Sequence, residues 1–124
     1  MKKIAAMMAL GLAMALSAPV IAHESPAKHG GIVKSAGDLS FELVNKDGKV
    51  TIHVDDHGEP VATAGATGTL TVLKGTQKSE TTLSAGAGNT LVAKDDVKLE
   101  AGNKVLARVT LPGKPAVSVR YAIK

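Results

Sequence analysis

The sequence predicts an all-β domain, an antiparallel β-sandwich of immunoglobulin-like type with seven or eight short strands. Apolar and polar residues alternate with a period of two, as in strands that bury one face. Turn-forming pairs such as Asp47-Gly48, Gly102-Asn103 and Pro112-Gly113 recur at fairly regular intervals. No segment after residue 22 has a convincing helical period. A small β-barrel is the alternative architecture.

The clearest element is a hairpin around Asp47-Gly48. This pair favours a two-residue turn in which both central residues have positive φ, and such a turn fixes the register of the flanking strands. The resulting register pairs apolar residues on the core face and a polar pair on the outer face: Leu43 with Ile52, Phe41 with Val54, and Glu42 with His53.

The remaining strands follow from the same alternation. Residues 61–67 are rich in alanine, glycine and threonine and are expected to connect the two sheets, and residues 85–89 form a flexible loop. Strands are expected near residues 32–33, 69–73, 78–84, 91–93, 105–111 and 117–123, with residues 97–99 as a further apolar pair.

The first 22 residues have the pattern of a secretory signal peptide. Lys2 and Lys3 precede an apolar run, and Val20-Ile21-Ala22 offers a cleavage site. The run is shorter than the roughly 20 residues that span a bilayer, so a retained membrane anchor is the weaker alternative. We therefore expect export to the periplasm without a stable membrane anchor. The expected organisation is a signal peptide (1–22), a flexible N-terminal arm (23–31) and a β-sandwich domain (32–124).

Composition excludes several classes of function. Cleavage after Ala22 would leave 102 residues with 13 basic and 11 acidic side chains, a net charge of about +2 that gives no reason to expect nucleic acid. Phe41 and Tyr121 are the only aromatic residues, too few for a base-stacking platform. The chain has no cysteine, which excludes disulfides and thiolate metal sites. No catalytic motif is present, so we expect no enzyme; an oxidase built on a terminal histidine is a distant alternative.

Two candidate metal ligands lie on the arm. Cleavage after Ala22 would make His23 the first residue, whose α-amine and imidazole together suit Cu(II). His29 precedes Gly30-Gly31, two residues that allow unusual backbone angles and a close approach of the chain. The alternatives are a disordered terminus and a simple glycine-rich entry into the first strand.

The other candidates lie on the hairpin. His53 faces Glu42, a carboxylate that would fix its orientation as in metal sites; the alternative is an ordinary cross-strand pair. Asp55 and His57 follow at the end of that strand. Without mature methionine or cysteine, Cu(II) or Zn(II) is favoured over Cu(I). The candidate ligands are therefore His23, His29, His53 and His57, with Glu42 and Asp55 to orient or complete the site.

Several short motifs resemble exported domains that accompany heavy-metal efflux systems, including a segment near the start of periplasmic adaptor (membrane-fusion) proteins. The motifs are His29-Gly30-Gly31, Phe41-Glu42-Leu43-Val44, the run from Val50 to Val61, the run from Ala64 to Leu73, and Val117-Ser118-Val119-Arg120-Tyr121. The resemblance implies a periplasmic β-sandwich linked to metal handling, without a defined ligand set. Where such relatives often carry an aromatic residue in the second hairpin strand, this chain has His53.

These observations lead to two hypotheses about function. The first is a periplasmic metal-binding accessory protein that holds Cu(II) or Zn(II) through its histidines and serves heavy-metal resistance, with an efflux-pump adaptor or another periplasmic protein as its partner. The alternative is a metal-free interaction module that docks on an exported partner, for example by adding an edge strand.

Overall fold

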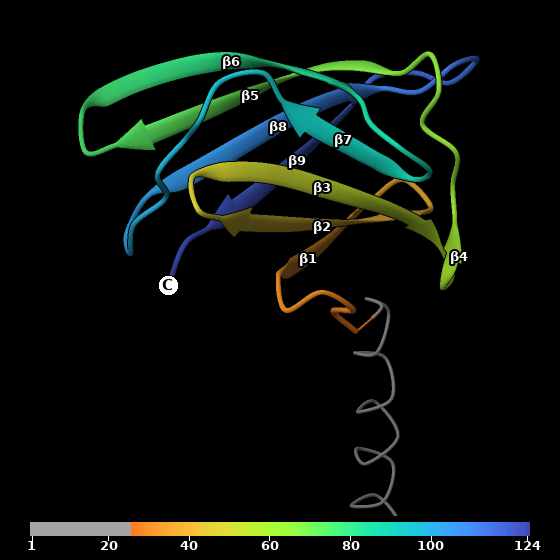
Figure 1. Ribbon diagram of the computed structural model, residues 1–124, viewed down its shortest axis with the longest axis horizontal. Coiled ribbons are helices and arrows are strands. Elements are labelled where there is room, and N and C mark those ends of the chain that lie inside the picture. The colour runs from red at the N-terminus through yellow and green to blue at the C-terminus, as the bar shows by residue number, and fades with distance from the viewer. Residues whose placement is uncertain (1–25) are drawn as a thin grey trace, which may run out of the picture.

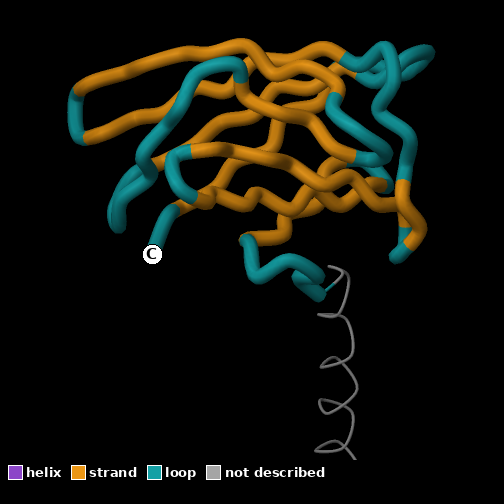
Figure 2. The backbone as a smooth tube through the Cα atoms, viewed as in Figure 1, coloured by secondary structure: helices purple, strands orange, loops and turns teal. Residues whose placement is uncertain are grey.

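The computed structural model describes residues 26–124. Those residues form strands joined by loops and turns, with no helix (Figure 2). The all-β class expected from the sequence is thus confirmed. Accordingly, the described part of the chain has no helix long and apolar enough to cross a membrane. The signal peptide assigned to residues 1–22 and the ligand candidate His23 lie outside the described residues.

The structure contains nine strands among the described residues. They are β1 (Ile32–Ala36), β2 (Leu39–Lys46), β3 (Lys49–Asp56), β4 (Glu59–Pro60), β5 (Thr67–Lys74), β6 (Gln77–Ala85), β7 (Thr90–Ala93), β8 (Lys104–Thr110) and β9 (Val117–Ala122).

Eight of these strands form one antiparallel sheet in the order β1-β2-β3-β7-β6-β5-β8-β9, and the two-residue β4 pairs with β3 beside it. The sheet folds over on itself, so β1, β2 and β3 lie opposite β5, β6 and β8 (Figure 1). The ladder between β6 and β7 joins the two layers on one side. On the other side β1 and β9 lie against each other without a ladder, which leaves a nearly closed, barrel-like sandwich.

The expected register of the first hairpin is confirmed. Leu43 pairs with Ile52, Phe41 with Val54, and Glu42 with His53. The turn residues Asp47 and Gly48 have φ values of 51° and 81°, as the two-residue turn requires.

The core fills the space between the two layers. It is built from alternate residues of the strands, which the period of two predicts. At one end, the buried Tyr121 hydroxyl donates a hydrogen bond to the Phe41 carbonyl oxygen at 3.0 Å and ties β9 to β2. Residues 97–99 form no strand; Val97 and Leu99 pack against the core from a loop. The largest fully buried side chains include Phe41, Ile52, Leu70, Leu83, Leu91 and Val109.

The outward residues of the two layers form two faces, one of which is covered by another segment of the chain. The outer face of β1, β2, β3 and β7 is crossed by residues 28–31, and we call it the covered face. The outer face of β5, β6, β8 and β9 carries exposed side chains, and we call it the open face.

Candidate functional site

Glu42 is the centre of the covered face. It points outward from β2, yet the residue is only 4% exposed. Its carboxylate accepts backbone N–H hydrogen bonds from Lys28 at 3.1 Å, from His29 at 2.8 Å and from Gly31 at 2.8 Å. One carboxylate thus fixes the backbone that leads into β1.

The two glycines before β1 make this approach possible. Gly30 has a φ of 74°, a backbone conformation that residues other than glycine rarely adopt. A Cβ on Gly31 would lie 2.2 Å from the Leu43 carbonyl oxygen, so only glycine lets the chain pass so close to β2. Both properties expected of the glycine pair are present: an unusual backbone angle and a close approach.

The His29 side chain is held by the same carboxylate. Its Nδ1 lies 2.9 Å from Glu42 Oε1, and its ring stacks on that of His53 with centroids 3.6 Å apart and planes 8° from parallel. An ionised carboxylate only accepts hydrogen bonds, so Nδ1 of His29 must carry a proton. Nε2 is therefore the nitrogen through which this ring can reach a metal ion, and 45% of the side chain is exposed.

The pKa values of two groups record this environment. Burial alone would raise the pKa of Glu42, but the hydrogen bonds from the His29 ring and from the N–H groups of Gly31, His29 and Lys28 outweigh it and lower the pKa to about 2. Burial, with a further contribution from His29, lowers the pKa of His53, against the opposing charges of Glu42 and Asp55. At neutral pH the site thus combines an ionised carboxylate with a neutral His53.

Asp55 contacts both residue 28 and the loop before β7. Its residue is 9% exposed, and its carboxylate lies 3.3 Å from Lys28 Nζ and accepts a hydrogen bond from Asn89 Nδ2 at 3.2 Å. Lys28 Nζ also donates to the Gly58 carbonyl oxygen at 2.8 Å. Asp55 therefore ties residue 28 and the loop before β7 to the end of β3.

The structure brings together three of the six proposed ligands: His29, His53 and Glu42. His57 lies in the β3–β4 turn, with a φ of 51°; its ring is 85% exposed and contacts Asp56 Oδ1 at 2.6 Å. Within residues 26–124, no group of three or more histidine, aspartate or glutamate side chains is placed to hold a metal ion. A metal bound at His29 and His53 would therefore need a further ligand.

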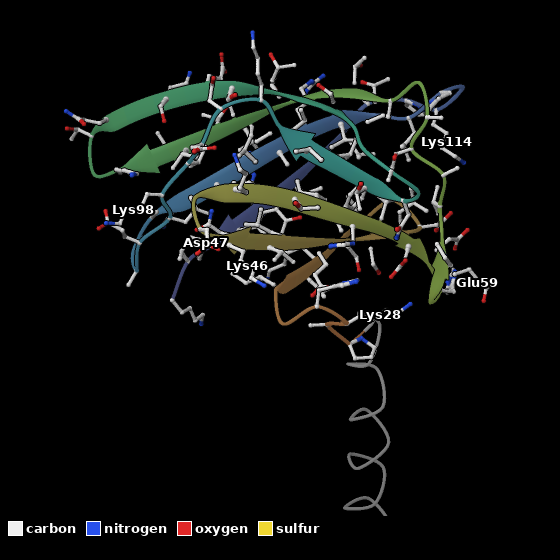
Figure 3. The ribbon with its side chains drawn as sticks, viewed as in Figure 1. Lys28, Lys46, Asp47, Glu59, Lys98 and Lys114 are labelled. Carbon is white, nitrogen blue, oxygen red and sulfur yellow. The ribbon has the colours of Figure 1, made fainter. Side chains whose placement is uncertain are left out.

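Sequence reasoning missed Lys28 and Asn89. Figure 3 shows Lys28 on the segment that leads into β1, close to the sheet end where Glu59 lies. Neither residue carries a motif of its own. The only signal was indirect. A glycine pair next to a strand indicates that the chain passes close to another segment, and Glu42, which points outward, could accept hydrogen bonds from its backbone N–H groups.

Comparison with known proteins places the chain in no group: no family model, no curated protein and no solved structure matches it.

Proposed function

We propose that this chain is an exported, periplasmic metal-binding protein that holds Cu(II) or Zn(II) at His29 and His53, with Glu42 as the positioning carboxylate. One observation carries the proposal: Glu42 holds Nδ1 of His29, so Nε2 is the nitrogen left to bind a metal ion, and the ring of His53 stacks directly on that of His29. Histidine ligands in metal sites commonly donate their other ring N–H to a carboxylate in this way.

The donor set suits these two ions. Both accept imidazole nitrogen, and Cu(II) favours a tetragonal set of nitrogen and oxygen ligands. Because the two ring planes are nearly parallel and stacked, nitrogen lone pairs in those planes do not converge on one point. One of the two rings must rotate before both can bind the same ion. The ring of His53 can do so, because no hydrogen bond with a described residue restrains it.

His23 is our choice for the missing ligand. It stands six positions before His29, and six residues of extended chain reach about 20 Å, which is ample to return to the two imidazoles. If the signal peptide is cleaved after Ala22, this residue supplies an α-amine and an imidazole together. A site closed by a chain terminus on a partly exposed imidazole suits a protein that buffers metal or passes it to an efflux partner.

The test is a calorimetric titration of the chain beginning at His23 with Cu(II) and with Zn(II). His29→Ala and His53→Ala should each weaken binding by more than about tenfold, and Glu42→Gln by about 10- to 100-fold, since it removes the charge that orients the ligand. His57→Ala is the matched control, because this histidine lies in an exposed turn and should not change the affinity. One extra residue before His23 should weaken Cu(II) binding by displacing the α-amine.

Two results would contradict this proposal. Loss of affinity in His57→Ala alone would move the site to the β3–β4 turn. Unchanged affinity in the double variant of His29 and His53 would remove these ligands altogether and favour the metal-free interaction module.

A further inference from the structure

The open face contains a groove with a volume of about 490 Å³. Leu73 and Leu106 line it, with Thr69 and Thr71 beside them, and four basic residues lie around them. We call it the basic groove, after the cations that line it: Lys78, Lys104, Arg108 and Arg120.

Strand register explains why these residues meet. Leu106 of β8 lies between Thr71 of β5 and Arg120 of β9, whereas Leu73 of β5 lies between Lys78 of β6 and Lys104 of β8. Each leucine therefore has a cation beside it on a neighbouring strand, and the two leucines are diagonal neighbours on adjacent strands. The result is an apolar floor with positive charge at its sides, assembled from residues of β5, β6, β8 and β9. Figure 1 shows these four strands as one layer of the fold.

Among the described residues, the cations of the basic groove form no ion pair with a carboxylate. Within residues 26–124, the lysine and arginine side chains that form ion pairs are those of Lys28 and Lys49. The single acidic residue of the groove, Glu80, is exposed and accepts a hydrogen bond from Thr71 Oγ1 at 3.2 Å. The floor is also open to water, since Leu73 is 42% exposed. The basic groove thus combines cations without an ion-pair partner in the described part of the chain and apolar surface that is exposed to water.

We propose that the basic groove docks an extended acidic segment of a partner protein, with carboxylates on the cations and an apolar side chain on the leucines. Charge complementarity indicates a negatively charged partner. The two leucines offer apolar contact, which a free inorganic anion cannot use. Nucleic acid is disfavoured because Phe41 and Tyr121 are buried, which leaves no aromatic ring for base stacking. A membrane surface is disfavoured because the charged face is hollowed, and a flat bilayer does not enter a groove.

The probe for this proposal is a dye-labelled peptide of sequence Glu-Leu-Glu-Leu-Glu, measured by fluorescence anisotropy at low ionic strength. The same peptide with glutamine in place of glutamate is the control ligand. Amide chemical shifts on adding the glutamate peptide should change mainly in β5 and β8. The double variant Arg108→Glu/Arg120→Glu should weaken binding by about tenfold or more, since two favourable charge contacts become repulsive.

A second double variant, Lys46→Glu/Lys98→Glu, changes the net charge equally but places the changes outside the groove, at two exposed lysines labelled in Figure 3. It should retain binding within about twofold if the contact is local. Equal weakening by both double variants would overturn the proposal in favour of diffuse attraction. Equal binding of the glutamine peptide, or tighter binding to phosphatidylglycerol vesicles, would also overturn it. Arg120→Gln, a milder change, repeats the test if charge reversal impairs folding. None of these outcomes bears on metal binding at His29 and His53.

Discussion

The covered face and the open face are built from the same kind of antiparallel strands, yet similar side chains meet opposite conditions on them. Glu42 points outward from β2 and is 4% exposed, whereas Glu80 points outward from β6 and lies in solvent. The difference is the segment of residues 28–31, which crosses one face and not the other. An outward position in a strand therefore sets which way a side chain points, but a covering segment decides whether it is buried.

The same difference sets the chemistry of each face. On the covered face one carboxylate is satisfied by three backbone N–H groups and an imidazole, which gives a rigid arrangement with a defined proton position. On the open face the cations of the basic groove are exposed and form no ion pair within residues 26–124. We therefore propose a small ion as the ligand of the covered face and an extended peptide segment as the ligand of the open face.

The largest expected effect is on stability, and it should differ between alanine substitutions of Glu42 and Glu80. Lowering the pKa of Glu42 from 4.5 to about 2 means that folding favours the ionised over the protonated carboxyl by about 3 kcal/mol. Glu42→Ala removes the acceptor of three backbone N–H groups and should lower the free energy of unfolding by roughly 2–4 kcal/mol. Glu80→Ala should change it by less than about 0.5 kcal/mol, because the side chain is exposed. Urea denaturation at neutral pH measures both. Equal, small losses would show that the arm does not depend on Glu42.

The acid dependence of stability is a related prediction. Because the folded pKa of Glu42 lies below its ordinary value of 4.5, its contribution is fully present above that value and is lost as pH falls towards about 2. The pKa of His53 is also lowered on folding, so protonation favours the unfolded chain as pH falls through the ordinary value of 6.5. Stability measured against pH should therefore decline in two steps. Glu42→Gln should remove the more acidic step; persistence of that step would assign it to another carboxylate.

Gly31→Ala tests the covering segment itself. The added Cβ would lie 2.2 Å from the Leu43 carbonyl oxygen, so the segment must move away from β2 and lose hydrogen bonds to Glu42. We expect a loss of about 1–3 kcal/mol in the free energy of unfolding. Metal affinity should fall as well, since His29 moves with the segment. A variant with wild-type stability and affinity would show that the close approach is dispensable.

The smallest expected effect is on the open face. Leu73→Ser should change the free energy of unfolding by less than about 0.5 kcal/mol, because Leu73 is 42% exposed and packs little. The same change should weaken binding of the Glu-Leu-Glu-Leu-Glu peptide. Thermal unfolding checks the first statement and anisotropy the second. A large loss of stability would mean that Leu73 supports the fold and is not kept for a partner.

The sequence predicted the fold well wherever the information is local. Alternation and the Asp47-Gly48 turn were sufficient to place Glu42 opposite His53, because a two-residue turn leaves one register. The apolar pair Val97 and Leu99 packs against the core as its composition suggests, but from a loop without a ladder partner, so apolar residues alone did not decide between strand and loop.

The sites were harder to predict because they depend on segments distant in sequence. His29 and His53 were both candidates, but their stacking requires the chain to return across β2, which no local pattern specifies. His57 was a candidate because all four histidines fall in about the first third of the chain that follows residue 22, yet its side chain lies 85% exposed in the β3–β4 turn. The basic groove was not foreseen, since Lys78, Arg108 and Arg120 lie on three strands whose order is known only from the structure.

The role of Glu42 and the two histidine ligands are tested most directly by long-range ¹H–¹⁵N NMR, which reports the protonation state of each histidine at neutral pH with and without Zn(II). We predict that His29 carries its proton on Nδ1, and that Zn(II) shifts the ring nitrogens of His29 and His53 and leaves those of His57 unchanged. Glu42→Gln should weaken this preference of His29. A proton on Nε2 of His29 in the wild-type chain, or a Zn(II) shift confined to His57, would contradict the central claim that Glu42 prepares His29 to bind metal.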